Sequence, residues 1–161
     1  MTSKNHGRKP VRYTGQHFLH DQSLINQIID HGQINNNDVV LDIGAGKGAL
    51  TGPLSARAER VIAIERDEQL VHHFKQSFTK KPGVKILGMD FRDMPLPNHP
   101  FKVVSNIPYA ITTDIFGRLM DQPKTKFRNG VFLIQLEAAR RFTEEPSSDP
   151  RIIGWNTWFD I

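Results

Sequence analysis

The sequence predicts an α/β fold built on a doubly wound parallel sheet, and two observations support this. Five short apolar runs recur along the chain, and helix-sized stretches separate them. Strands joined by crossover helices lie parallel, and a ligand site then lies beyond their carboxyl ends. With 161 residues, 38% of them hydrophobic, the chain can form one sizeable core and gives no reason to expect two complete domains.

The apolar runs predict buried strands at residues 39–43, 61–64, 84–87, 101–104 and 131–134. Three helices are expected from their capping residues. Asp21 would cap a helix that runs to about residue 31, and Asp67 would cap one over about 68–77. Thr113 would cap a third helix over 114–120.

The net charge is +4, from 21 Lys and Arg against 17 Asp and Glu, and the excess is concentrated at the start of the chain. Lys4, Arg8, Lys9 and Arg12 all precede the first acidic residue, Asp21. We treat residues 1–12 as a basic flexible arm and residues 13–161 as the folded domain. Such an arm can follow the phosphates of a nucleic acid, or it can be a solubilising terminus.

The residue types that are absent exclude several classes of site. The chain contains no cysteine, which excludes disulfides, thiolate zinc sites and a cysteine nucleophile. No apolar run is long enough to span a bilayer, so we expect a soluble, cytoplasmic protein without membrane contact. His72 and His73 are adjacent on an expected helix and point about 100° apart, so no metal site is expected there.

The first strand ends in the glycine-rich segment Leu-Asp-Ile-Gly-Ala-Gly-Lys-Gly, residues 41–48. Gly44 and Gly46 allow a tight turn and a close approach of the backbone to a ligand. The pattern satisfies a dinucleotide-type fingerprint, with Glu65 about twenty residues later to bind a ribose diol. A structural glycine turn remains the alternative. A Walker loop is excluded because Lys47 is followed by Gly48.

Two acidic residues follow the next two strands. Glu65 closes the second strand, where its carboxylate can accept hydrogen bonds from two hydroxyl groups. Asp90 follows the third strand, and it can accept from an adenine amino group while Phe91 lies against the ring. Either acid alone could be a solvated or capping residue, but together they outline an adenosine site.

The fourth strand leads into Asn106, Ile107, Pro108 and Tyr109. An exocyclic amine on a base is a poor nucleophile, so an enzyme that alkylates it must hold both N–H groups. Asn106 offers one acceptor, and Pro108 biases Ile107 toward an extended conformation that could present a backbone carbonyl as the second. Tyr109 offers a ring on which a base can stack. The alternative is an ordinary turn at a strand end.

In order and spacing these segments resemble the rRNA adenine N6-methyltransferases of the Erm type. Residues 15–21 resemble that family's N-terminal cofactor motif, and residues 154–161 resemble the segment that enters its sixth strand. The resemblance covers about residues 13–161. It implies a Rossmann-like S-adenosyl-L-methionine-dependent methyltransferase sheet. It also implies mono- or dimethylation of the N6 atom of an adenine in 23S rRNA, which gives macrolide, lincosamide and streptogramin B resistance.

Small-subunit rRNA dimethyltransferases share the Asn-Ile-Pro-Tyr motif and are not excluded by it, whereas residues 15–19 and the Trp-rich end favour the Erm type. The resemblance implies catalytic roles for Asn106 and Tyr109, and RNA contacts for Lys4, Arg8, Lys9 and Arg12. His17 stands where many relatives have Asn, and we expect a backbone contact there. The residues implied to bind the cofactor are His17, Leu19, Gly44, Gly46, Glu65, Arg66, Asp90, Phe91 and Asn106.

The chain stops where relatives continue into a seventh strand, an aromatic Phe-x-Pro-x-Pro loop and a helical RNA-binding domain. We therefore expect a monomeric fragment with a sheet that is incomplete at its C-terminal edge, a naturally shortened homologue being the alternative. Residues 151–161 are expected to fray or to adopt a non-native arrangement. Trp155 and Trp158 are expected to pack against the sheet.

Two other classes of protein fit parts of the sequence. The glycine fingerprint also occurs in nicotinamide-dependent oxidoreductases, but no proton-relay residue follows the fourth strand. A non-catalytic RNA-binding module would account for the basic arm.

Overall fold

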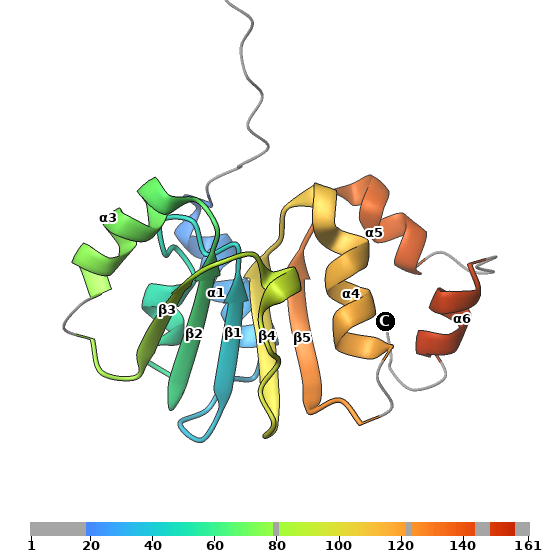
Figure 1. Cartoon of the computed structure of the whole chain (residues 1–161), viewed down its shortest axis with the longest axis horizontal. Helices are drawn as coiled ribbons and strands as arrows, with labels where there is room; N and C mark the ends of the chain where they lie inside the picture. The colour runs from blue at the N-terminus through green and yellow to red at the C-terminus, as the bar shows by residue number, and fades with distance from the viewer. Residues whose placement is uncertain (1–18, 79–80, 122–123, 144–148, 157–161) are drawn as a thin grey trace, which may run out of the picture.

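The computed structural model describes residues 19–78, 81–121, 124–143 and 149–156. Its centre is a five-stranded sheet in the order β3-β2-β1-β4-β5, and every neighbouring pair is parallel (Figure 1). The strands are β1 (Val39–Ile43), β2 (Arg60–Glu65), β3 (Val84–Gly88), β4 (Phe101–Asn106) and β5 (Phe127–Leu133). The predicted doubly wound parallel sheet is confirmed.

Within the described residues, six α-helices and two 3-10 turns lie before, between and after the strands. The helices are α1 (Gln22–His31), α2 (Thr51–Leu54), α3 (Glu68–Phe78), α4 (Thr112–Met120), α5 (Leu136–Thr143) and α6 (Pro150–Asn156). The turns are η1 (Phe91–Asp93) and η2 (Tyr109–Ile111). In this part of the chain, no helix has the length and apolar character to cross a membrane.

Two of the predicted helix caps are confirmed. Asp21 accepts hydrogen bonds from the backbone N–H groups of Ser23 and Leu24 at 2.8 and 3.2 Å. The carboxylate of Asp67 accepts from the second and third residues of α3 at 2.9 and 3.1 Å. Each bond satisfies a donor that the first turn of a helix would otherwise leave unpaired.

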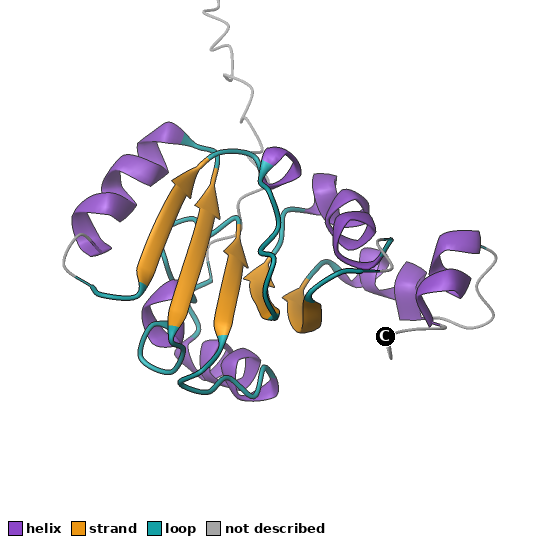
Figure 2. Ribbon diagram, turned by 60° about the horizontal axis from the view of Figure 1, so that its bottom comes forward, coloured by secondary structure: helices purple, strands orange, loops and turns teal. Residues whose placement is uncertain are grey.

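Helices cover both faces of the sheet (Figure 2). On one face, Ile25, Ile28 and Ile29 of α1 pack with Val40 and Val61. The spacing of these isoleucines places them on one side of a helix, which explains why α1 buries that side. The other face carries α4, whose packed residues are Ile115 and Leu119. In Figure 1, α4 and α6 lie at the β5 end of the sheet and α3 lies at the β3 end.

The start of α4 and its cap differ from the prediction. The helix begins at Thr112 rather than Asp114, and the N-cap residue is Ile111, which makes no side-chain capping bond. The 3-10 turn η2 directly precedes the helix, and Ile111 N donates to Pro108 O at 3.2 Å. Thr112 Oγ1 donates to the same carbonyl at 3.4 Å. A hydrogen-bonded turn thus replaces the predicted Thr113 cap.

A helix near the end of the chain corrects one further prediction. Residues 150–156 form α6, so residues 154–156 are helical and do not enter a strand as the resemblance implied. For residues 151–156, the expectation of fraying or of a non-native arrangement is met only in that a helix stands in place of the implied strand. Ile152 and Trp155 are buried against Phe116 and Phe142, and Trp155 Nε1 donates to Asp121 at 2.6 Å. Trp155 therefore has the packing role that was expected, although its partners lie mainly on helices. Residues 157–161, with Trp158, lie outside the described residues.

Candidate functional site

The glycine-rich turn after β1 is held against the loop after β4. Gly44 has φ +72° and Gly46 has φ +57°, in the left-handed region that favours glycine. A Cβ atom on Gly44 would lie 3.1 Å from Pro108 Cδ, so a side chain there would press on the Asn-Ile-Pro-Tyr loop. The glycines were predicted to permit a close approach, and one neighbour that Gly44 approaches is this loop.

A buried hydroxyl joins the two strands that carry these loops. Ile43 N at the end of β1 donates to Ser105 Oγ in β4 at 2.7 Å, and Ser105 is fully buried. The order of the sheet reverses between β1 and β4, and crevices for ligands form at such a point. Ser105 was not singled out in the sequence, because a serine beside a catalytic motif has no distinctive signal.

A cavity of about 240 Å³ opens at this point. Four of the predicted cofactor residues line it, namely Leu19, Gly44, Gly46 and Asn106. His20, Asp42 and Lys47 also line it, and the sequence prediction missed all three. The glycine loop, the residues before α1 and the end of β4 thus surround one space, whereas the predicted cofactor residues Glu65, Arg66, Asp90 and Phe91 are not among the residues that line it.

Glu65 lies at the carboxyl end of β2, beside the glycine loop as predicted. Its Oε2 atom accepts from Gly46 N and its Oε1 atom accepts from Asp67 N, both at 2.9 Å, and the residue is only 5% exposed. A carboxylate has about four lone-pair sites. One site on each oxygen therefore remains for another donor, which matches the two hydroxyls of a ribose diol.

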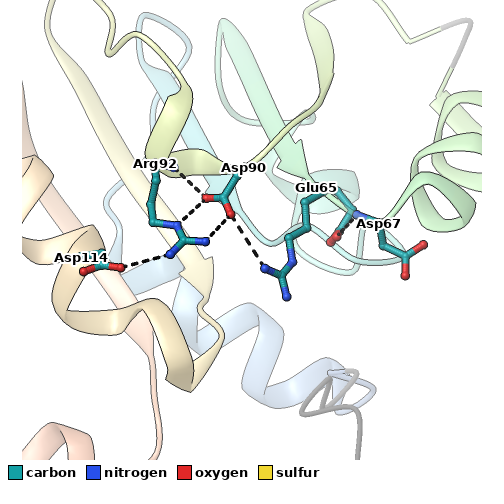
Figure 3. A network of polar contacts seen from close by, with 6 residues as sticks. Glu65, Asp67, Asp90, Arg92 and Asp114 are labelled. Atoms are coloured by element: carbon teal, nitrogen blue, oxygen red, sulfur yellow. Dashed lines mark hydrogen bonds and ion pairs between the residues drawn. The ribbon is translucent and has the colours of Figure 1, made fainter.

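Asp90 lies at the end of β3 and is part of a polar network (Figure 3). Arg92 Nε lies 3.0 Å from Oδ1 and Arg92 Nη2 lies 2.8 Å from Oδ2. The predicted cofactor residue Arg66 has its Nη1 atom 3.8 Å from Oδ2. The hydrogen bonds from Arg92 lower the pKa of Asp90 to about 2, so Asp90 is an ionised acceptor at neutral pH.

The position of Phe91 corrects one prediction. Its ring is 2% exposed and packs in the main core cluster, where the Arg118 guanidinium lies 5.4 Å from the ring centroid. A ring that is enclosed in this way has no free face for an adenine. Phe91 anchors η1 to the core, which fixes the backbone beside Asp90.

Asp42 is the most perturbed of the residues that the sequence prediction missed. It is 1% exposed in β1 and accepts a hydrogen bond from Thr51 Oγ1 at 2.6 Å. Burial, with a smaller contribution from the charge of Glu65, raises the pKa of Asp42 to about 7 against the opposing Thr51 bond. A carboxyl group in an apolar strand two residues before a glycine turn is the signal that could have identified it.

This pKa has a consequence for stability. Between pH 3.8 and about pH 7 the folded protein keeps a proton on Asp42, whereas the unfolded chain has lost it. The free energy of unfolding therefore falls as the pH rises through this window, and it levels off above pH 7. The lowered pKa of Asp90 acts only below about pH 4, where its contribution is lost as the pH falls toward 2.

Some predicted site residues lie outside the described part of the chain. They are His17 and the four basic residues Lys4, Arg8, Lys9 and Arg12. Tyr109 opens η2, but its side chain is also outside what the structure describes. Among residues 19–78, 81–121, 124–143 and 149–156, no group of three or more His, Asp or Glu side chains could hold a metal ion.

Comparison with known proteins connects this geometry to a family. The profile of the ribosomal RNA adenine dimethylase family matches residues 8–153. The chain belongs to this family. A curated rRNA adenine N-6-methyltransferase from Bacteroides fragilis is 45% identical over the whole chain, which covers 59% of that protein. The chain thus spans about three fifths of the length of this relative.

Two further relatives show the breadth of the family. A probable ribosomal RNA small subunit methyltransferase A from Methanopyrus kandleri is 35% identical over 89% of this chain and 50% of its own length. The crystal structure of the 23S rRNA methyltransferase ErmE is 31% identical with a TM-score of 0.70, over 78% of this chain and 50% of that one. The Rossmann-like fold and the recognised resemblance are therefore confirmed.

Proposed function

We propose that this chain is the cofactor-binding and catalytic part of a cytoplasmic, monomeric S-adenosyl-L-methionine-dependent enzyme that methylates the N6 atom of an adenine in 23S rRNA. The observation that carries the proposal is that Asn106 lines the same cavity as the glycine loop. This arrangement lets one residue meet both a methyl donor and a target amine. Membership of the ribosomal RNA adenine dimethylase family supports the same reaction.

The residues around the cavity fit an adenosyl ligand. Gly44 and Gly46 line it. Outside this lining, beyond the carboxyl ends of the next two strands, Glu65 retains one acceptor site on each oxygen and Asp90 is an ionised acceptor. Leu19 would contact the methionine part. When it is bound, S-adenosyl-L-methionine supplies a methyl group that is already activated on a sulfonium, so no protein nucleophile is required.

The loop after β4 would hold the target amine. Asn106 offers its side-chain oxygen as one acceptor. The Pro108 carbonyl already accepts from Ile111 N and Thr112 Oγ1, so we assign the second acceptor to the carbonyl of Ile107. Catalysis would come from alignment and from these acceptors, and the proton would pass to water because an amide is too weak a base. Tyr109 would stack on the base.

The assignment to 23S rRNA, and to macrolide-lincosamide-streptogramin B resistance, rests on similarity. Identity is 45% to the rRNA adenine N-6-methyltransferase from Bacteroides fragilis, against 35% to the small-subunit relative from Methanopyrus kandleri. Methylation of small-subunit rRNA is the second candidate. In either case the basic arm, residues 1–12, would contribute phosphate contacts through Lys4, Arg8, Lys9 and Arg12.

Transfer of a tritiated methyl group to purified 23S and 16S rRNA tests the proposal. We expect incorporation into 23S rRNA above that of an Asn106→Ala control, which lacks the side-chain acceptor and whose folding is checked by thermal unfolding. Stronger incorporation into 16S rRNA would favour the small-subunit alternative. RNA binding without incorporation, together with no calorimetric binding of S-adenosylhomocysteine, would leave only a non-catalytic RNA-binding module.

A further inference from the structure

Arg92 takes up most of the hydrogen-bonding capacity of Asp90. Its Nε and backbone N–H donate to Oδ1 at 3.0 and 2.9 Å, and its Nη2 donates to Oδ2 at 2.8 Å. These three donors fill three of the four lone-pair sites of the carboxylate. The fourth site is on Oδ2, and Arg66 Nη1, at 3.8 Å, is too distant for a hydrogen bond to it.

Arg92 is itself fixed by α4. Its Nη1 atom lies 3.6 Å from Asp114 Oδ2, and Figure 3 shows its guanidinium between the carboxylates of Asp114 and Asp90. Arg118 donates to the backbone carbonyls of Arg92 and Met94, the second at 2.5 Å. Both the side chain and the backbone of Arg92 are therefore tied to the helix that follows the Asn-Ile-Pro-Tyr loop.

We propose that Arg92 is a positioning residue that selects the base of the cofactor, because its planar fork orients Asp90 and leaves one acceptor site, on Oδ2, for an amino group. A purine with a 6-amino group can donate to this site. A purine with a 6-oxo group presents an acceptor to an acceptor and is rejected. This inference rests on the proposed function, since it assumes that Asp90 faces the adenine of S-adenosyl-L-methionine.

The alternative role for Arg92 is competition. If the guanidinium had to leave before adenine could reach Asp90, its removal would raise the affinity for the cofactor. If Arg92 orients Asp90, its removal frees the carboxylate to rotate and to bind water, and the affinity falls. The two roles therefore predict changes of opposite sign.

Calorimetric titration with S-adenosylhomocysteine and S-inosylhomocysteine, which differ in the 6-amino and 6-oxo groups, distinguishes these roles. We expect the wild type to bind the adenosyl compound about 10- to 100-fold more tightly, the range of one charge-assisted hydrogen bond. In Arg92→Ala this ratio should fall at least about fivefold toward that of Asp90→Ala, mainly through weaker binding of the adenosyl compound. The ratio should fall similarly in Arg92→Lys, because an ammonium group cannot hold both carboxylate oxygens in one plane.

Arg57→Ala is the matched control. Arg57 forms a 2.6 Å ion pair with Asp30, but it lies shortly before β2 begins, at the amino-terminal end of that strand and therefore away from the strand carboxyl ends. Its removal should leave both affinities unchanged, and thermal unfolding checks that every variant is folded.

Three results would overturn the inference. Tighter binding of S-adenosylhomocysteine by Arg92→Ala would show competition. A wild-type ratio of the two affinities in Arg92→Ala, or in Arg92→Lys, would show that the Arg92 guanidinium does not orient Asp90. If the wild type binds neither compound, the proposed function fails together with the inference. If the wild type prefers the adenosyl compound but Arg92→Ala keeps that preference, only the inference about Arg92 fails.

Discussion

Replacement of Glu65 is expected to weaken cofactor binding far more than RNA binding. Each carboxylate oxygen holds one backbone N–H at 2.9 Å and keeps one acceptor site for a ribose hydroxyl. A hydrogen bond to a charged group contributes about 1.5–3 kcal/mol, so the loss of two such bonds is about 3–6 kcal/mol. Glu65→Ala should therefore raise the Kd for S-adenosylhomocysteine by roughly 10²- to 10⁴-fold.

The same substitution also removes support from the glycine loop. Gly46 N and Asp67 N lose their acceptor, and a buried unpaired donor costs about 1–3 kcal/mol, so the thermal unfolding temperature should fall. Glu65→Gln separates the two effects, because its amide keeps the shape and one acceptor oxygen. We expect it to lose about half as much binding free energy with less change in unfolding temperature.

Isothermal titration calorimetry measures the cofactor affinity, and a filter-binding assay measures the RNA affinity. Glu59→Ala is the control, since Glu59 is exposed and lies just before β2, at the opposite end from the cavity. A folded Glu65→Ala protein with wild-type affinity for S-adenosylhomocysteine would remove Glu65 from the site and would contradict the ribose assignment.

Three further predictions concern pH, base stacking and RNA. In the wild type, the pKa of Asp42 is about 7 in the folded protein and 3.8 in the unfolded chain, and each pKa unit corresponds to about 1.4 kcal/mol. The free energy of unfolding should therefore decrease by roughly 4 kcal/mol between pH 4 and 7, and Asp42→Asn should abolish this decrease. Urea unfolding across this pH range tests it, and parallel curves for the two proteins would contradict it. Tyr109→Phe should keep most methyl transfer to 23S rRNA while Tyr109→Ala loses it, because stacking needs only the ring. Equal damage would assign the role to the hydroxyl. Deletion of residues 1–12 should reduce the slope of log affinity against log salt by about 0.7–0.9 per lost phosphate contact, and an unchanged slope would identify a passive tail.

The sequence by itself determined the sheet and the edge at which the site lies. Strands β1 to β4 were predicted within two residues of their ends, because runs of β-branched and aliphatic residues between helix caps have few other structures available. Asp21 and Asp67 cap helices by bonds to residues two and three positions away, which is local chemistry. β5 was less well placed, since it begins at Phe127 rather than Val131.

Only the tertiary structure decided how the site residues are paired and buried. The raised pKa of Asp42 comes from packing around β1, and the bond between Ser105 and Ile43 joins residues 62 positions apart. The register between β1 and β4 that creates this bond is set by packing across the whole sheet, which no local pattern contains.

The same distinction explains two of the predictions that were wrong. Phe91 follows Asp90 in a pattern that suits a ligand contact, but its ring is buried in the core, because burial of a phenyl group is strongly favourable. Trp155 lies in a helix because Phe116 and Phe142, from α4 and α5, provide an apolar surface for it. Local sequence records which residues need burial, whereas only the fold determines which partners bury them.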